Sequence, residues 1–486
     1  MKRDNDRELL MKRDNHKELL MKRRTDKELL KRIVRLVKQN KELNEELRKL
    51  AERNVKLAGI VENYQRKLSR QKVIDPVNGS TDSIANVLKF RMGTVLFADI
   101  IGFARLTAQM DTQGMMDELD DLFYQFDLIV KKYKLQKIKT IGDSYMCAGG
   151  VPVKNSTNPI DVVMAALEMH HYLGKLKQRS EKNRVWDIRI GIHTGSVTAI
   201  ANGKRKISWE LKGDNVNIAS RLASSCVINN INISANTYEL VKEFFVCDYN
   251  GKIPVKYLGD LTMYYVRGII PEISQESKGI IPNDSFNIKF QLIQFVDLQE
   301  IMLDKLETEL PGYLYYHNVK HTIDVVTEVE LIGWAEGVSE EEVLLLKTAA
   351  LFHDSGHTIA YDNHEYLGCQ LAREYLPKYN YNEGQIERIC ELIMATQMPP
   401  DPKNLLEKII CDSDLDYLGR SDFIPVSNTL YDELREQDKI GSFNDWNKLQ
   451  IKFISGHQYF TETARNLREV NKQKQIERIK SILGED

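Results

Sequence analysis

The sequence predicts a chain of three parts, in which an N-terminal coiled coil is followed by an α+β domain and an all-α domain. Three observations carry this prediction. The chain has 486 residues, which is too long for one hydrophobic core. Residues 1–75 combine a helical ten-residue repeat with heptad spacing from Ile33 to Leu68, residues 76–270 show mixed strand and helix patterns, and residues 286–486 show helical spacing. Clusters of Pro, Gly, Asn and Ser separate these parts.

The N-terminal part opens with a ten-residue segment that occurs three times, MKRDNDRELL, MKRDNHKELL and MKRRTDKELL. From Ile33 to Leu68, the residues spaced alternately by three and four are mostly apolar, which is the pattern of a coiled coil. Leu at the d positions, with Asn40 and Asn54 at a positions, favours two parallel helices because buried Asn side chains pair and fix the register. We therefore expect a parallel homodimer. The alternative is a single amphipathic helix packed on its own domain.

The central part combines short apolar strands with longer helical patterns. The clearest strands are residues 93–97 and 188–192, and the clearest helices are residues 117–133 and 160–176. Asn202-Gly203 separates two further apolar runs, and this dipeptide favours the positive φ angles of a hairpin turn. Residues 271–285, rich in Gly, Pro and Asn, are expected to form a linker, after which the pattern is helical.

The composition excludes several classes of protein. With 68 basic and 70 acidic residues, the net charge of -2 gives no overall field that would favour nucleic acid. The six cysteines are scattered singly, which is unlike a zinc ribbon or a disulfide scaffold. We find neither a run of about 20 apolar residues nor a signal peptide, so we expect no membrane span and a cytoplasmic location.

Two carboxylates stand where strands meet turns. Asp99 lies in VLFADIIGF, at the end of an apolar strand, and Asp143 lies in KIKTIGDSYM, at the tip of an expected hairpin. Backbone N–H groups in the turn after Asp99 can receive phosphate oxygens. Two carboxylates can also hold two Mg²⁺ ions against a triphosphate. Taken singly, each Asp would be interpreted as a turn-forming residue and not as a ligand.

Over about residues 90–270, the sequence resembles the catalytic domain of class III adenylate and guanylate cyclases. The resemblance rests on VLFADIIGF, KIKTIGDSYM, RIGIHTGSV and GDNVNIASR, in the family's order and approximate spacing. It implies a ferredoxin-like α+β fold that is catalytic only as a head-to-tail dimer. One chain would supply the metal ligands and the other would supply the residues that recognise the base and stabilise the transition state.

Carried over by position, Asp99 and Asp143 would bind two Mg²⁺ or Mn²⁺ ions. Asn217 would orient the ribose, and Arg221 would stabilise charge on the α-phosphoryl group. Further contacts to the metal or triphosphate are implied for Ile100, Gly102 and Phe103. Without the surrounding motifs, Asn217 and Arg221 would be interpreted as a pair on a helix surface.

The choice of base depends on Lys139 and Glu210, which match the family's two base-contacting positions. A Lys donor to N1 and a Glu acceptor for the amino group fit adenine, so we expect ATP as the substrate. The alternative for this pair is an exposed ion pair, worth about 0–1 kcal/mol. Leu258 departs from the family, which usually has a phosphate-binding Lys or Arg there, and Glu210 is longer than the residue usual beside Lys.

The C-terminal part carries histidines and acids in YHNVKHTIDV, LFHDSGH, NHE and CDSDLDYLG. This ordered set resembles the HD superfamily of metal-dependent phosphohydrolases, and the HNxxH spacing is similar to that of cyclic nucleotide phosphodiesterases. The implied ligands of one divalent metal are His321, His353, Asp354 and Asp412. His357 and His364 are candidate ligands of a second metal, and His317 is the candidate acid. Gln397 stands where some members have another histidine.

The sequence thus predicts a homodimeric adenylate cyclase that converts ATP to 3′,5′-cyclic AMP and pyrophosphate. Its HD domain is expected to hydrolyse a phosphoester, with a cyclic nucleotide as one candidate. Two alternatives stay open. The first is a guanylate cyclase or a cyclase of mixed specificity, and the second is a nucleotide-sensing scaffold whose HD domain is not catalytic.

Overall fold

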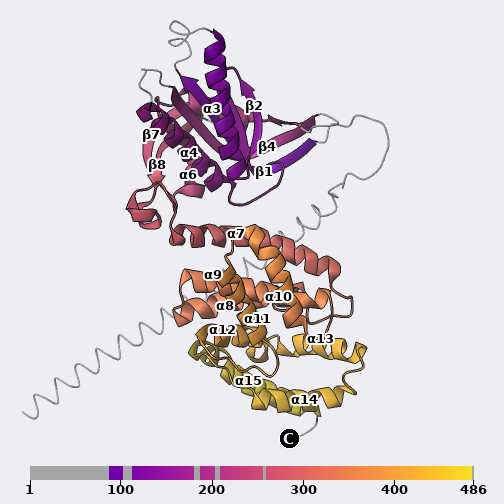
Figure 1. Cartoon of the computed structure of the whole chain (residues 1–486). Helices are drawn as coiled ribbons and strands as arrows, with labels where there is room; N and C mark the ends of the chain where they lie inside the picture. The colour runs from indigo at the N-terminus through magenta and orange to yellow at the C-terminus, as the bar shows by residue number, and fades with distance from the viewer. Residues whose placement is uncertain (1–86, 102–111, 180–185, 203–207, 256–258, 484–486) are drawn as a thin grey trace, which may run out of the picture. The chain divides into compact units, whose positions relative to one another are not determined.

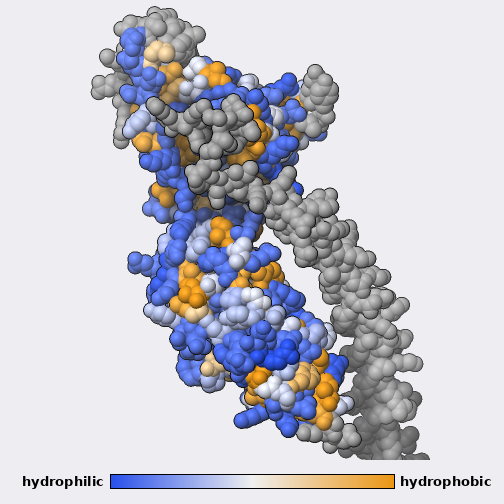
Figure 2. Space-filling view, turned by 90° about the vertical axis from the view of Figure 1, so that its right-hand side faces the viewer, coloured by the Kyte–Doolittle hydropathy of each residue, from blue (hydrophilic) through white to orange (hydrophobic). Residues whose placement is uncertain are grey.

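The computed structural model describes residues 87–101, 112–179, 186–202, 208–255 and 259–483 (Figure 1). All of them belong to one compact unit, Ile84–Asp486. The predicted coiled coil, with Asn40 and Asn54, lies outside the described residues, as do Gly102, Phe103 and Leu258. No described helix is long and apolar enough to cross a membrane. On the face drawn in Figure 2, hydrophobic residues form small groups among hydrophilic ones.

The described strands form a mixed eight-stranded sheet in the order β2-β3-β1-β4-β6-β8-β7, with β5 paired to β4. Their bounds are β1 Val87–Ile101, β2 Gln136–Ile141, β3 Ser144–Gly149, β4 Asp187–Asn202, β5 Ser208–Lys212, β6 Asn230–Ser234, β7 Phe245–Val255 and β8 Gly259–Ile269. Among these strands, β4 and β6 pair in parallel and the other neighbours are antiparallel. The predicted hairpin is formed by β4 and β5, where Ala201 lies opposite Trp209.

Helices cover both faces of this sheet, which explains the continuous apolar run in β1. Leu96, Ala98 and Ile100 pack with α3 Thr112–Lys132 and α4 Asn158–Arg179, whereas Val95 and Phe97 point to the other face, where α5 Asp214–Ser224 lies. Because successive side chains of a strand alternate between faces, burial on both faces requires apolar residues at consecutive positions. The short helix α6 Ala235–Val241 follows β6.

The segment that the sequence predicts as a second linker packs against this sheet domain. It contains two 3₁₀ turns, Pro271–Ile273 and Gln275–Ser277, and a bridge between Ser274 and Pro282. Ile273 and Phe286 join the core formed with α3 and α4. The Pro, Gly and Asn residues of this segment therefore indicate its irregular backbone correctly. The segment is nevertheless packed against the sheet domain and is not an extended linker.

The remainder is all helical, as the sequence predicts. Its elements are α7 Asp284–Glu309, α8 Val319–Glu336, α9 Glu340–Phe352, η3 Ser355–Thr358, α10 His364–Tyr375, η4 Leu376–Tyr379, α11 Glu383–Ala395, α12 Leu405–Asp414, η5 Asp416–Gly419, α13 Phe423–Glu436, α14 Phe443–Gly456 and α15 Glu462–Leu483. Helix α9 is the most buried of these, since every residue from Val343 to Phe352 except Lys347 is inaccessible to solvent or nearly so. The helix is therefore surrounded by its neighbours. This packing fixes the positions of His353 and Asp354, which follow the helix.

Candidate functional site

The two predicted carboxylate residues lie together at one end of the sheet. Pairing of β1 with β3 places Asp99 opposite Ser144, whose hydroxyl donates to Asp99 Oδ1 over 2.8 Å. Asp143 is in the turn between β2 and β3, and its carbonyl oxygen accepts from the Ile100 N–H at 2.9 Å. Gly142 in this turn has a φ of 60°, a conformation that glycine adopts without strain. The result is a pair of hard oxygen ligands at one sheet end, suited to Mg²⁺ or Mn²⁺.

The residues expected to act on ribose and phosphate lie on α5. Asn217 and Arg221 are both exposed and are four residues apart, so they share one face of this helix. The Arg221 guanidinium donates to the Pro254 carbonyl oxygen at 3.3 Å. Among the described residues, no hydrogen bond or ion pair joins Asn217 or Arg221 to Asp99 or Asp143. Within one chain, these two halves of the expected site are therefore not linked by a hydrogen bond or an ion pair in the described residues.

The two base-contacting candidates lie on strands that contact each other. Lys139 is exposed on β2, and Glu210 is half-buried on β5. The Lys212 ammonium lies 3.8 Å from Glu210 Oε2. In the described part of the chain the two candidates do not form an ion pair with each other.

A compact group of metal-ligand side chains occupies the helical domain. His321 on α8, His353 after α9 and Asp414 at the end of α12 bring their ligand atoms within 4.8 Å of one another. His321 Nε2 lies 3.1 Å from Asp414 Oδ1 and 3.3 Å from His353 Nε2. Asp354 adds a fourth atom, since its Oδ2 is 3.1 Å from His353 Nε2. Asp354 Oδ2 also lies 3.4 Å from His321 Nε2, so it borders the group of three that His321, His353 and Asp414 form.

The orientation of His353 suits a metal ligand. Its Nδ1 donates to the Ala350 carbonyl oxygen over 2.8 Å, which leaves the lone pair on Nε2 directed at the cluster. At the start of α8, the Asn318 side chain accepts from the backbone N–H groups of Lys320 and His321. This cap fixes the first turn of the helix that carries His321.

The expected ligand Asp412 lies outside this group. Its buried carboxylate accepts hydrogen bonds from the N–H groups of Phe460 and Thr461 and from the Thr461 hydroxyl. It therefore holds the segment before α15 in place. The structure brings Asp414 to the cluster instead, a residue that the sequence analysis did not select.

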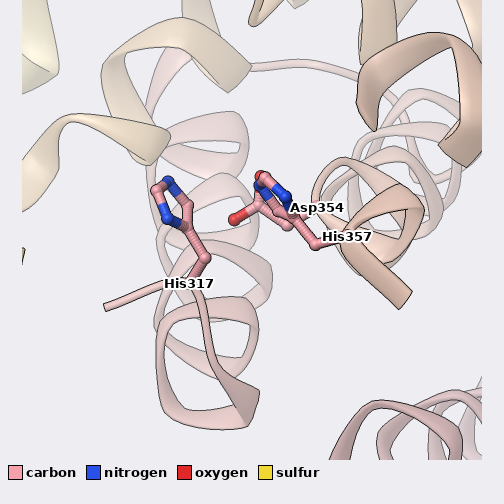
Figure 3. Close-up of side chains that lie close together, drawn as sticks. All are labelled: His317, Asp354 and His357. Carbon is pink, nitrogen blue, oxygen red and sulfur yellow. The ribbon is translucent and has the colours of Figure 1, made fainter. Parts of the chain in front are cut away.

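A second group shares Asp354 with the first. The ligand atoms of His317, Asp354 and His357 also lie within 4.8 Å of one another, and Figure 3 shows Asp354 and His357 facing His317. His364 Nε2 is 3.6 Å from Asp354 Oδ1, and its ring stacks on that of His357 at 4.0 Å. Asp354 therefore presents one oxygen to each group, as a carboxylate bridging two metals would.

The surroundings of the His357 ring indicate whether a second metal ion fits at this group. Both of its ring nitrogens are buried and have no hydrogen-bond partner among the described residues. Burial lowers the pKa of His357 to about 3, so the ring is neutral and offers a lone pair. Buried polar atoms without partners are uncommon. A divalent ion bound by Asp354, His357 and His364 would give the unprotonated nitrogen of this ring a partner.

His317 faces the same group and is set up to carry a proton. Its Nδ1 lies 2.5 Å from Glu433 Oε1, and the buried Glu433 also accepts from the N–H groups of Tyr316 and His317. Burial alone would lower the pKa of His317, but the carboxylates of Asp354 and Glu433 together raise it. Glu433 was missed by the sequence analysis because it stands on α13 without a motif around it.

A cavity of about 300 Å³ opens beside both groups. Its lining includes the polar side chains of His317, Asp354, His364 and Asp414. Most of the other lining residues are apolar, among them Leu418, Leu430, Trp446, Leu449, Phe453 and Ile454. The buried amide of Gln450 also lines the cavity and is hydrogen-bonded to the Ser427 hydroxyl and to Asn447. The cavity thus combines the histidine and aspartate side chains with a largely apolar lining.

Comparisons with known proteins divide the chain in the same way. Residues 87–268 match the family model for the adenylate and guanylate cyclase catalytic domain, and residues 318–416 match the HD domain model. A receptor-type guanylate cyclase of Caenorhabditis elegans is 31% identical over 189 residues, covering 38% of this chain and 15% of the relative. An adenylate cyclase of Mycobacterium tuberculosis is 34% identical over 180 residues, covering 37% of this chain and 40% of the relative.

Solved structures with sequence similarity cover the same region. The guanylate cyclase domain of RhGC from Catenaria anguillulae, in complex with GTP, is 31% identical, with a TM-score of 0.34, and the match covers 37% of this chain and 98% of that one. The adenylyl cyclase CyaB from P. aeruginosa is 28% identical, with a TM-score of 0.35, and the match covers 37% of this chain and 96% of that one. The chain spans less than half of the length of the curated relatives named above.

Proposed function

We propose, from the premise that this chain carries a class III adenylate and guanylate cyclase catalytic domain beside an HD domain, that it is a bifunctional enzyme. The first domain would make a cyclic nucleotide, and the HD domain would hydrolyse a phosphodiester. The observation that carries the second activity is the pair of histidine and aspartate groups that share Asp354 and open on one cavity.

In the cyclase reaction, Asp99 and Asp143 would hold two divalent ions, which supply charge stabilisation to the triphosphate and acidify the ribose 3′-hydroxyl. Asn217 and Arg221 would come from the partner subunit, because within the described part of one chain no hydrogen bond or ion pair links them to the carboxylate pair. Asn217 then orients the ribose. The Arg221 guanidinium then stabilises the negative charge that develops on the α-phosphoryl group as pyrophosphate leaves.

We propose ATP as the substrate. The Lys139 ammonium can donate to adenine N1, and the Glu210 carboxylate can accept from the adenine amino group. Guanine presents N1–H and a carbonyl at these edges, so both contacts would become mismatched. Because the relatives include guanylate as well as adenylate cyclases, GTP is the competing substrate to be measured.

The cyclase proposal is tested with the full-length chain, ATP or GTP, and Mn²⁺. We expect equimolar cyclic AMP and pyrophosphate from ATP, and a loss of at least about 100-fold in rate for Asp143→Asn, as for removal of a charge-stabilising group. Asp248→Asn, which removes an exposed carboxylate on β7, is the matched control and should keep the rate. A double variant Lys139→Glu, Glu210→Cys should shift preference toward GTP. No cyclic product from either nucleotide would overturn the proposal.

In the HD domain, the charged His317 would donate its proton to the leaving alkoxide, with Glu433 holding the ring in place. Divalent ions bound by the two groups would supply an activated water and stabilise charge on the phosphate. The largely apolar lining of the cavity and the Gln450 amide suit the flat, apolar faces and polar edge of a nucleobase. A cyclic nucleotide, the product of the first domain, is therefore our proposed substrate.

The hydrolase proposal is tested by adding cyclic AMP or cyclic GMP to the full-length chain without nucleoside triphosphate. We expect the 5′-nucleotide as product, loss of hydrolysis in His353→Ala, and an unchanged cyclase rate in that variant. His171→Ala, which removes an exposed histidine of α4, is the control. Full metal content with no hydrolysis of either cyclic nucleotide would favour a non-catalytic HD domain.

A further inference from the structure

The motif RIGIHTGSV lies in β4 and forms the surface on which α5 rests. A Cβ atom on Gly191 would stand 2.1 Å from the Ala223 nitrogen and 2.5 Å from the Ala219 carbonyl oxygen. A Cβ atom on Gly195 would stand 2.6 Å from the Asn215 side chain. Both glycines therefore allow the helix to lie directly against the strand, closer than any side chain would permit.

Between these glycines, His193 makes two hydrogen bonds inside the domain. Its side chain is buried, with Nδ1 2.7 Å from the Ser234 hydroxyl and Nε2 2.9 Å from Asn215 Oδ1. Asn215 Nδ2 donates to the Ser196 carbonyl oxygen over 2.6 Å, so Oδ1 is left to accept. The proton of the imidazole therefore sits on Nε2, and Nδ1 accepts from Ser234.

The neutral form of His193 is the one that these partners require. Burial lowers the pKa of His193, more than the hydrogen bond to Asn215 raises it. The ring therefore keeps one donor and one acceptor, matched to Asn215 on one side and Ser234 on the other.

Asn215 is in the first turn of α5, and the N-terminus of this helix has no side-chain cap. The N-cap residue is Gly213, which has no side chain to accept from the helix. Asn215 and Asn217 are two residues apart and so project from opposite sides of the helix. The inward Asn215 is held by His193, while Asn217 and Arg221 face outward. Since α5 has only 11 residues, a shift at its inner face moves its outer face as well.

We propose that His193 is a positioning residue for the cyclase reaction. Through its hydrogen bond to Asn215, it fixes the distance between α5 and β4 and the rotation of α5 about its axis. The position of α5 in turn places Asn217 and Arg221. This inference rests on the proposed cyclase function. A displacement of about 1 Å at a reacting group can cost about 100-fold in rate, so small movements of α5 are expected to matter.

The same buried region offers a matched control. Ser234 contacts the Thr237 hydroxyl, which lies 3.1 Å from that of Thr194, and Thr194 in turn lies 2.9 Å from Thr94. Thr94 is as buried as His193 but is not hydrogen-bonded to α5. Thr94→Val thus removes a buried hydrogen-bonding group without touching Asn215.

The test compares His193→Phe, Asn215→Ala, the double variant and Thr94→Val in the full-length chain. In His193→Phe and in Asn215→Ala, we expect kcat of the cyclase to fall about tenfold or more. KM for the nucleotide should change less than about threefold, because these variants misplace groups that stabilise the transition state. The double variant should be no slower than the slower single variant, because both residues act through one contact. His193→Gln, which keeps an N–H donor, should recover part of the rate. Thr94→Val should lower the unfolding temperature and keep kcat.

Hydrogen exchange supplies a readout that does not need activity, and Asn215→Ala covers the case in which His193→Phe fails to fold. The backbone amides of α5 should exchange faster in Asn215→Ala than in the unmodified chain, while those of α6 stay protected. Unchanged kcat with unchanged α5 exchange would overturn the inference, as would multiplicative losses in the double variant. If the unmodified chain makes no cyclic product, the proposed function fails instead, and exchange in α5 still decides whether His193 positions that helix.

Discussion

Asp412 and Asp414 stand two residues apart on α12, and the structure gives them different tasks. We expect Asp414→Asn to lose bound metal, because Asp414 Oδ1 lies 3.1 Å from His321 Nε2. We expect Asp412→Asn to keep the metal but to lower the free energy of unfolding by about 1–3 kcal/mol, since an amide cannot accept all three of its hydrogen bonds. Metal content after dialysis and calorimetric unfolding of both variants measure these effects. Metal lost from Asp412→Asn alone would return the assignment to Asp412.

This pair also marks the limit of what the sequence could predict at the residue scale. The ordered motifs selected His321, His353 and Asp354, and the structure places these three side chains close together. The run CDSDLDYLG, however, offers three acids at alternate positions, and neighbouring alternates point to opposite sides of a helix. Asp412 is buried and Asp414 lines the cavity, so the choice depends on which side of α12 meets His321. That is a tertiary contact, which local spacing does not encode.

His457, after α14, predicts a pH dependence of stability. Both its ring nitrogens are buried without a partner among the described residues, and its ring packs against Tyr459. Burial, and then the positive charge of Lys472, lower the pKa of His457 from 6.5 to about 4. Between these values the unfolded chain binds a proton that the folded chain excludes, so stability is full above about pH 6.5 and falls as the pH drops toward about 4.

We expect the unmodified chain to lose about 1–2 kcal/mol more than His457→Phe between neutral pH and about pH 5, a figure reduced for the ring's partial exposure. Calorimetric unfolding of both proteins at the two pH values gives this difference. Because all other titrating groups are common to the two proteins, equal losses would show that His457 does not contribute.

At the scale of elements, the close approach of η3 to α10 builds the second metal group. A Cβ atom on Gly356 would stand 1.9 Å from the His364 carbonyl oxygen, so only glycine lets these elements meet. We expect Gly356→Ala to separate His357 from His364, to lower the metal content and to abolish hydrolysis of the cyclic nucleotide, while the cyclase rate is kept. Gly312→Ala, where an added Cβ meets nothing within 4 Å, is the matched control. Normal metal content in Gly356→Ala would contradict this account of the site.

Elements were predicted from the sequence more reliably than their packing. The apolar run before Asp99 and the helical spacing at residues 117–133 and 160–176 correspond to β1, α3 and α4. Residues 271–285 are irregular, as their prolines and glycines indicate, yet Ile273 is buried against the sheet domain. Turn residues determine local dihedral angles. Whether the segment packs against another part of the protein depends on residues that are distant in the sequence.

At the scale of the whole molecule, the two proposed activities place different demands on assembly. The HD groups and their cavity are complete within one chain. The carboxylate pair and the outward face of α5 are not linked by a hydrogen bond or an ion pair within the described part of one chain, so the cyclase is expected to need a second copy. The predicted heptads of residues 33–68, with Asn40 and Asn54 at a positions, are the expected source of that pairing.

Deleting residues 1–75 should therefore separate the two activities. Without the coiled coil, pairing of the cyclase domains becomes bimolecular, and the effective concentration that a short linkage provides, of the order of millimolar, is lost. We expect the cyclase rate per chain to rise with protein concentration in the deleted protein and to be constant in the unmodified one, whereas hydrolysis per chain should be constant in both. Fusing an unrelated parallel two-stranded coiled coil in the same heptad register should restore the cyclase. A cyclase rate that is independent of concentration after the deletion would show that the catalytic domains pair without the N-terminal part, or act singly.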